Sequence, residues 1–273
     1  MTAAKSRAPD FGALRRDALA VRRKLLSMHF EAHSGHIGSG LSCVEILVYA
    51  HRIWKKPEDR FILSKGHAAS ALYAVFNHVG LLSDADLGTY YKDSTLLPAH
   101  PAAGALEEVP AATGSLGHGL PIAAGLAFAH RKIRKSSSRA LALLSDGECD
   151  EGSVWEAALF ASHHQLDNLT AIVDVNGLQG FGGTRDVLNL EPLAAKWRAF
   201  GFLTREINGH DFKSIHAAVT LPRRRGDRRP LCLLARTVKG KGVRFMENRL
   251  EWHYLPMDEG QFKRALKDVE ASR

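Results

Sequence analysis

Two polar residues stand just after apolar runs that have the length and composition of buried strands. Asp146 comes after the run at 140–144, and Asn176 follows the run at 169–175. In an open parallel sheet, ligands bind at the carboxyl ends of the strands. Carboxylate and carboxamide oxygens suit Mg2+, which completes its shell with phosphate oxygens and water. Gly147 adds backbone N–H groups that can approach a diphosphate at a helix N-terminus. The pattern therefore predicts a magnesium and diphosphate site.

Each dipeptide also has a simpler interpretation. Asp146-Gly147 and Asn176-Gly177 would both serve as turns that end a strand, and for either one alone the turn is favoured. Their occurrence after two neighbouring strands favours the metal and diphosphate site over two unrelated turns.

The chain's 14 histidines also have a simpler interpretation, because most histidines in proteins are structural or exposed. Those assigned to that ordinary class are His29, His33, His51, His78, His130, His163, His164 and His216.

The elements that position these residues follow from hydrophobic periodicity. Residues 11–28 repeat apolar positions at spacings of three and four, as an amphipathic helix does. The pattern predicts further helices at 44–51, 68–78, 121–133, 153–166, 192–200, 212–221 and 258–271. It predicts strands at 60–63, 140–144, 169–175, 203–207 and 231–238. Glycines indicate a turn at 34–40, and glycines and prolines indicate irregular chain at 96–119. In the helix at 153–166, the residues predicted on or near one buried face are Val154, Trp155, Ala158, Leu159 and Leu166.

The alternation of these strands and helices predicts an α/β fold with a single doubly wound, mostly parallel sheet flanked by helices. We expect residues 1–9 to form an N-terminal tail and residues 10–273 to form one domain.

Composition narrows the class of protein. The 273 residues are 45% hydrophobic and 24% charged, which describes a soluble globular protein and excludes wholesale disorder. A net charge of +8 makes phosphorylated small molecules, nucleic acid and anionic membranes candidate partners.

No run approaches the ~18 apolar residues of a membrane span, and residues 1–20 lack a signal peptide's apolar core. The cysteines show no C-x-x-C pair, so neither a zinc site nor a disulfide framework is indicated, and we expect a cytoplasmic protein. The basic stretch 223–230 lacks aromatic residues and fits a solvated loop better than a nucleic-acid surface.

The motif at the first strand end resembles that of a known enzyme family. Asp146-Gly147, Glu151-Gly152 five residues later and Asn176 thirty residues after the aspartate are similar to the thiamine diphosphate motif of transketolases. Further segments that resemble that family, in the same order, are Ser34-Gly35-His36, Ser64-Lys65-Gly66-His67, Ala99-His100-Pro101, Thr113-Gly114-Ser115-Leu116-Gly117 and Asn208-Gly209-His210-Asp211. The resemblance runs from about residue 10 to residue 270, and it implies that the domain at 10–273 is a thiamine diphosphate-binding domain of transketolase type.

The resemblance implies roles for individual residues. It assigns Asp146, Asn176 and the backbone carbonyl of Leu178 to Mg2+. The residues that it places around thiamine diphosphate are His67, Gly114, Ser115, Leu116, Gly147, Glu148, Asn176 and His253. It also implies that His36 and His100 meet the hydroxyls of the donor sugar and handle protons. Glu151 would lie at a subunit interface, near the partner's glutamate that activates the cofactor.

The sequence also departs from the family. Ser145 replaces the glycine that usually precedes the Asp-Gly pair and could crowd the backbone nearest the metal, and His118 stands where large transketolases usually carry glutamine. The family's pyrimidine-binding and C-terminal domains have no counterpart in these 273 residues. The first of those domains supplies the activating glutamate, so we expect the chain to be catalytically incomplete alone.

These observations predict the N-terminal subunit of a split transketolase that uses thiamine diphosphate and Mg2+. It would transfer a two-carbon ketol unit from a ketose to an aldose, together with a partner chain that carries the pyrimidine-binding domain, in an α2β2 heterotetramer. A phosphorylated ketose is favoured, while sulfonated and unmodified sugars stay open.

Two alternatives remain at this point. One is another thiamine diphosphate-dependent subunit, of 2-oxoacid decarboxylase or 1-deoxyxylulose 5-phosphate synthase type, although the set of His36, His67 and His100 favours ketol transfer. The other is a non-catalytic basic protein that binds nucleic acid or acts as a scaffold.

Overall fold

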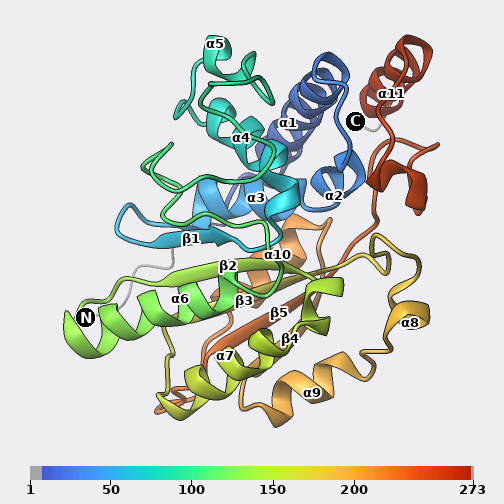
Figure 1. Cartoon of the computed structure of the whole chain (residues 1–273). Helices are drawn as coiled ribbons and strands as arrows, with labels where there is room; N and C mark the ends of the chain where they lie inside the picture. The colour runs from blue at the N-terminus through green and yellow to red at the C-terminus, as the bar shows by residue number, and fades with distance from the viewer. Residues whose placement is uncertain (1–7, 272–273) are drawn as a thin grey trace.

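The computed structural model describes residues 8–271 and contains one sheet of five parallel strands between layers of helices (Figure 1). The strands lie in the order β1-β2-β3-β5-β4. Their bounds are Arg60–Leu63 for β1, Ala140–Ser145 for β2, Leu169–Val175 for β3, Leu203–Asn208 for β4 and Leu231–Arg236 for β5. The predicted α/β fold with a parallel sheet is confirmed, whereas the predicted division into tail and domain stays a prediction because residues 1–7 lie outside the described residues.

Helices cover both faces of the sheet. One layer contains α1 (Phe11–Glu31), α2 (Ile37–Ser42), α3 (Val44–Tyr49), α4 (Ala69–His78), α10 (Phe212–Thr220) and α11 (Glu259–Ala271), and the other contains α6 (Gly119–Phe128), α7 (Gly152–His163) and α9 (Leu193–Ala199). Shorter segments are α5 (Asp84–Leu87), α8 (Thr184–Val187), the π-helical Ala50–Trp54 and Ala129–Ile133, and the 3-10 turns Gly66–Ala68, Gly147–Asp150 and Leu250–His253.

Alternate side chains of the central strands enter opposite cores. Leu141 and Leu143 of β2 belong to the cluster under α1, α3 and α4, while Ala142 and Leu144 belong to the cluster over α6, α7 and α9. A strand buried on both faces needs apolar residues at most positions, which is why β2 and β3 appear in the sequence as largely apolar runs. Because all the strands are parallel, their carboxyl ends lie along one edge of the sheet.

Two expectations about the helices were wrong. The segment at 34–40 is only partly a turn, because α2 begins at Ile37 and all its residues are buried. Gly40 lets this short helix approach α1 closely, since a Cβ at Gly40 would lie 3.2 Å from the side chain of Leu25. Tertiary packing therefore makes a helix from a sequence whose glycines disfavour one.

The second error concerns Leu159, which was predicted near the buried face of α7 but is 58% exposed. It is one residue from the buried Ala158, and successive helical residues are rotated by about 100°.

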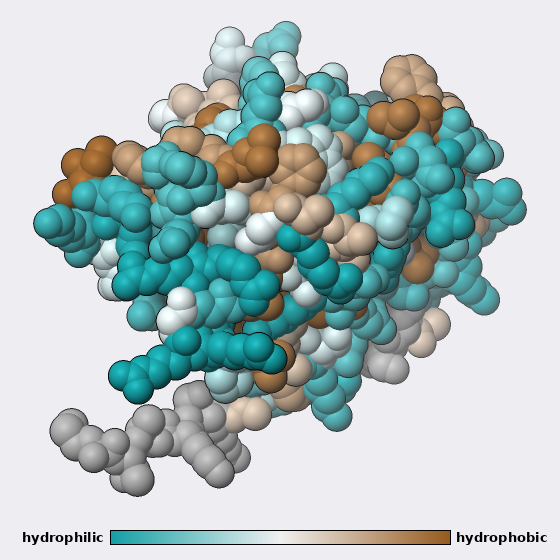
Figure 2. All heavy atoms as spheres, turned by 90° about the horizontal axis from the view of Figure 1, so that it is seen from below, coloured by the Kyte–Doolittle hydropathy of each residue, from teal (hydrophilic) through white to brown (hydrophobic). Residues whose placement is uncertain are grey.

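Figure 2 shows the molecule from below, where hydrophilic side chains predominate and hydrophobic ones form separate small groups. The exposed large hydrophobic residues of the α6 and α7 region are Ile133, Leu159 and Phe160.

The basic stretch at 223–230 lies in a loop, as the sequence predicts. The connection between α10 and β5 is irregular, and within it Asp227 accepts hydrogen bonds from the Arg229 guanidinium, so the basic stretch is partly neutralised within itself. Within residues 8–271, no helix combines the length and apolar character that crossing a bilayer requires.

The packing around α7 predicts different outcomes for two identical substitutions. Leu166→Ala should lower the free energy of unfolding by about 2–5 kcal/mol, because Leu166 is completely buried. Leu159→Ala should change it by less than about 0.5 kcal/mol. Urea unfolding of the purified variants measures both values, and a loss at Leu159 equal to that at Leu166, which follows the helix, would contradict this assignment of exposed and buried side chains.

Candidate cofactor and metal site

Histidines from four separate segments meet at the carboxyl edge of the sheet. His36 immediately precedes α2, His67 follows β1, His100 lies in the long loop before α6, and His253 ends the 3-10 turn before α11. The ring centroid of His36 lies 5.6 Å from that of His67, 6.1 Å from that of His100 and 4.9 Å from that of His253. The structure therefore brings together the four histidines that the sequence assigned to one site.

The surroundings of these rings favour their neutral form. Burial lowers the pKa of His36, His67 and His100. The pKa of His253 falls to about 3, because the charge of Lys239 reinforces the effect of burial. Lys239 Nζ lies 2.8 Å from His253 Nδ1 and donates to it, which leaves the proton of His253 on Nε2. A neutral imidazole can both donate a hydrogen bond to a hydroxyl group of a ligand and accept one from it.

The oxygens predicted to hold Mg2+ follow β2 and β3. The carboxylate of Asp146, a residue only 2% exposed, accepts a 2.7 Å hydrogen bond from the backbone N–H of Gly177. Burial raises the pKa of Asp146 to about 6. The carboxamide oxygen of Asn176 lies in the same turn and accepts from the Leu178 backbone N–H at 3.1 Å. A cavity of about 460 Å3 has Asp146 and Asn176 in its wall.

This donor set fits Mg2+ and a diphosphate. It consists of oxygens alone, and a bound cation would stabilise the desolvated carboxylate of Asp146. Within residues 8–271, no group of three or more His, Cys, Asp and Glu side chains could hold a metal ion. Magnesium at this position remains a prediction.

Lys239 is a site residue that the sequence analysis missed. It follows β5, is 1% exposed, and donates to the carbonyl of Leu178 at 3.3 Å as well as to His253. Burial and the charge of Lys65 lower the pKa of Lys239 to about 8. An anion at this position would stabilise the ammonium group. The only signal in the sequence was a lysine directly before glycine at a strand end, which a solvated turn explains equally well.

A second buried lysine serves the structure around the site. Lys65 Nζ lies 2.5 Å from the carboxylate of Asp174, and both side chains are completely buried. The same carboxylate accepts hydrogen bonds from the hydroxyls of Ser42 and Thr237. Although burial opposes both charges, Asp174 raises the pKa of Lys65, and Lys65 lowers the pKa of Asp174. The pair joins the ends of β1, β3 and β5 to α2.

The side chain of Glu148, which the sequence places at the cofactor, is bound within the protein. Its buried carboxylate accepts hydrogen bonds from the Ser64 hydroxyl at 2.5 Å and from the backbone N–H groups of Gly117 at 2.9 Å and Ser145 at 3.3 Å. These contacts fix the loop that carries Gly114, Ser115 and Leu116. A direct contact between Glu148 and the cofactor stays untested.

Further predicted positions lie around the mouth of the site. The Ser145 hydroxyl accepts from the Glu148 backbone N–H at 3.2 Å, so it is used within the turn after β2. Gly114 lies against His100, because a Cβ there would be 3.5 Å from the imidazole ring. Glu151 and His118 are exposed at the surface. Glu151 is therefore accessible to another chain.

The comparisons with known proteins agree with this geometry. Residues 16–269 match the model of the family described as "Transketolase, thiamine diphosphate binding domain". The chain is 38% identical to one of the subunits of the apulose-4-phosphate transketolase of Actinobacillus succinogenes, over 96% of this chain and 97% of that one. It is 36% identical to 6-deoxy-6-sulfo-D-fructose transketolase subunit SqwG of Clostridium sp., over 94% and 96%. The crystal structure of transketolase from Campylobacter jejuni superposes with a TM-score of 0.87 at 29% identity, over 96% of this chain and 43% of that one.

The ion pair beneath the site predicts a strongly non-additive mutant cycle. Lys65→Met should lower the free energy of unfolding by about 3–5 kcal/mol, because it leaves a buried carboxylate without a counter-charge. Asp174→Asn should destabilise for the converse reason. The double variant should lose less than the sum of the two single losses, because it buries no unpaired charge. Equilibrium unfolding of the four proteins measures the coupling, and additive losses would contradict a direct pair.

Proposed function

Because this chain belongs to the transketolase family, in which it corresponds to the thiamine diphosphate-binding domain, we propose that it is the cofactor-binding subunit of a two-chain transketolase that moves a two-carbon ketol unit from a ketose to an aldose. The observation that carries the proposal is the meeting of four neutral histidines, Lys239 and the turns after β2 and β3 at one edge of the sheet. The two relatives named as single subunits of transketolases have nearly the same length as this chain, which supports a division into two chains.

The residues at the strand ends would hold the cofactor's charged end. Asp146, Asn176 and the Leu178 carbonyl would bind Mg2+, and Lys239 and the Gly147 backbone N–H would bind the diphosphate. When bound, thiamine diphosphate supplies the carbon nucleophile and electron sink for breaking a bond next to a ketose carbonyl. Glu148 would act indirectly, by fixing the loop at Gly114–Leu116 that faces the rings of the cofactor.

The histidine cluster would bind the donor sugar and move its protons. His36 and His100 are neutral and partly exposed, so each can donate to or accept from a sugar hydroxyl. A general base for a hydroxyl proton must start in the neutral form, which burial of these rings supplies. His253 accepts a hydrogen bond from Lys239, and burial together with the charge of Lys65 lowers the pKa of His67. This arrangement supports ketol transfer over decarboxylation of a 2-oxoacid, which has no row of hydroxyls to bind.

A partner chain would complete the site on its exposed side. Gly114, Ser115 and Glu151 are exposed there. Phe181, at the end of the turn that follows the metal residues, is 89% exposed, and Tyr254 beside His253 is 54% exposed. Apolar side chains of this size next to a polar site are typical of a protein interface. We propose that the pyrimidine-binding chain covers them and that the complex is an α2β2 heterotetramer.

The proposed substrate is an anionic ketose. By their names, the two relatives act on apulose 4-phosphate and on 6-deoxy-6-sulfo-D-fructose. Both donors would carry a negative group away from the reacting carbonyl. We propose a ketose phosphate for this chain, and the sulfonated ketose is the second candidate. A panel of both classes and of unmodified ketoses distinguishes them.

Removal of the metal carboxylate should abolish activity. Asp146→Ala, in the complex with the partner chain, should lower kcat/KM for ketol transfer by at least about 100-fold, because even the groups that hydrogen-bond to a metal's ligands contribute about 10–100-fold. Asp93→Ala replaces an exposed aspartate in the loop after α5 and should leave the rate unchanged. Ketol transfer in the Asp146→Ala complex at the wild-type rate would disprove the assignment.

A further inference from the structure

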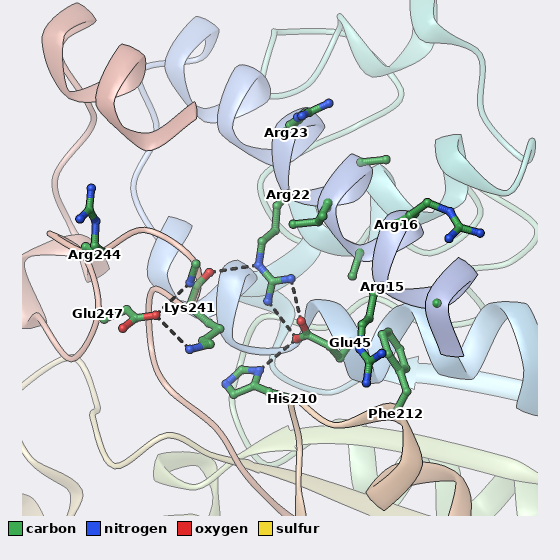
Figure 3. A pocket seen from close by; sticks show the side chains of 15 residues that line it. Arg15, Arg16, Arg22, Arg23, Glu45, His210, Phe212, Lys241, Arg244 and Glu247 are labelled. Atoms are coloured by element: carbon green, nitrogen blue, oxygen red, sulfur yellow. Dashed lines mark hydrogen bonds and ion pairs between the residues drawn. The ribbon is translucent and has the colours of Figure 1, made fainter. Parts of the chain in front are cut away.

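A buried cluster of Arg22, Glu45 and His210 lies behind the site and makes no predicted contact with cofactor or sugar (Figure 3). Arg22 donates to both carboxylate oxygens of Glu45, at 2.7 and 2.9 Å. His210 Nδ1 lies 3.0 Å from the same carboxylate. The side chains of Arg22 and Glu45 are only 5% and 10% exposed. Glu45 therefore binds a guanidinium and an imidazole that come from two other, distant parts of the chain.

The hydrogen bonds define the proton position on His210. The backbone N–H of Val238 donates to His210 Nε2 at 2.9 Å, so that nitrogen is an acceptor. The ring proton is then on Nδ1 and points at Glu45. The Nε of Arg22 donates to the carbonyl of Lys241 at 3.1 Å, and its Nη2 also donates to the carbonyl of Leu41 at 3.5 Å. Both partners of Glu45 thus also bind the main chain at 238–241.

These two bonds flank Lys239 in the sequence. His210 holds the residue before it, and Arg22 holds the second residue after it. The intervening Gly240 has φ +80, and a Cβ there would lie 2.4 Å from the carbonyl oxygen of Met246, so the turn requires glycine. The Gly240 N–H also donates to the Gly38 carbonyl at 3.0 Å. The backbone of this turn is therefore fixed at every residue around Lys239.

The same region forms the wall of a cavity of about 820 Å3, but its cations do not make an anion site. Figure 3 shows Arg22, Glu45 and His210 converging, whereas the guanidinium groups of Arg16 and Arg244 point away from them. Arg244 is also bound to Asp268. The convergent feature of the cavity wall is thus the cluster around Glu45.

We propose that Glu45 is a positioning residue: through Arg22 and His210 it holds the turn at 238–241 so that the Lys239 ammonium meets the diphosphate of the bound cofactor. The proposal rests on the proposed function for the identity of that ligand. It assigns a role to Asn208-Gly209-His210-Asp211, where Asp211 caps α10 and His210 supports the Lys239 turn. A misplaced ammonium group would weaken cofactor binding more than it would slow the reaction of the bound cofactor.

The test compares cofactor affinity in matched variants of the two-chain complex. Glu45→Gln keeps the shape of the side chain but removes the charge and one acceptor oxygen. We expect its Kd for thiamine diphosphate, measured by calorimetry in Mg2+, to rise about 10-fold, with kcat at saturating cofactor within about 3-fold of wild type, the size expected for loss of one charge-assisted hydrogen bond. When no cofactor is added, hydrogen exchange at the Val238 amide should be faster in the Glu45→Gln complex than in the wild-type complex.

Asp59→Asn separates positioning from general destabilisation. Asp59 is also a buried carboxylate paired with an arginine, Arg139, but it lies at the amino ends of β1 and β2. This variant should lose stability and keep the wild-type Kd. His210→Asn removes one support without breaking the ion pair, and it should also raise the Kd. It provides the same test if Glu45→Gln does not fold.

A mutant cycle with Lys239→Met tests the route. If Glu45 acts through Lys239, the Kd of Glu45→Gln/Lys239→Met should equal that of Lys239→Met. Additive effects on Kd, or an unchanged Kd in both Glu45→Gln and His210→Asn, would overturn the positioning role while leaving the proposed function intact. Absence of binding by the wild-type complex would instead overturn the proposed function and this proposal with it.

Discussion

All five strands run in one direction, and the site depends on this constraint. It brings the turns after β1, β2, β3 and β5 to one edge, where the chain leaves the sheet with polar residues. Charged groups at that edge are largely desolvated, so each needs a counter-charge. The Lys65–Asp174 pair provides one inside the protein. Among residues 8–271, Asp146 and Lys239 have no ion-pair partner of this kind, and this difference separates the groups that hold the fold from those available to a ligand.

Much of the fold follows from the sequence because both cores demand apolar strands. The predicted strands at 60–63 and 169–175 have the same bounds as β1 and β3. The predicted strand at 140–144 lacks only the last residue of β2. The helix α2 was not predictable, since its glycines serve the contact with α1 rather than helix formation. Leu159 was misplaced because hydrophobicity alone does not distinguish a core side chain from an exposed neighbour about one-quarter turn away.

The site was predicted where residue types carry the chemistry and missed where only the tertiary structure does. His36, His67, His100 and His253 could be grouped from their motifs, and the structure places their rings together. Lys239 and its support by Glu45 could not, because Glu45 and His210 are 165 residues apart in the chain. The electrostatics of the site thus combine local motifs with long-range contacts that no short pattern reports.

We propose above all that this chain provides the diphosphate half of a two-chain thiamine diphosphate site. The decisive experiment is calorimetric titration of thiamine diphosphate into the chain mixed with its partner. We expect one cofactor to bind per copy of this chain, and we expect binding to be abolished when EDTA removes Mg2+. Absence of binding, or equally tight binding in EDTA, would contradict the proposed site.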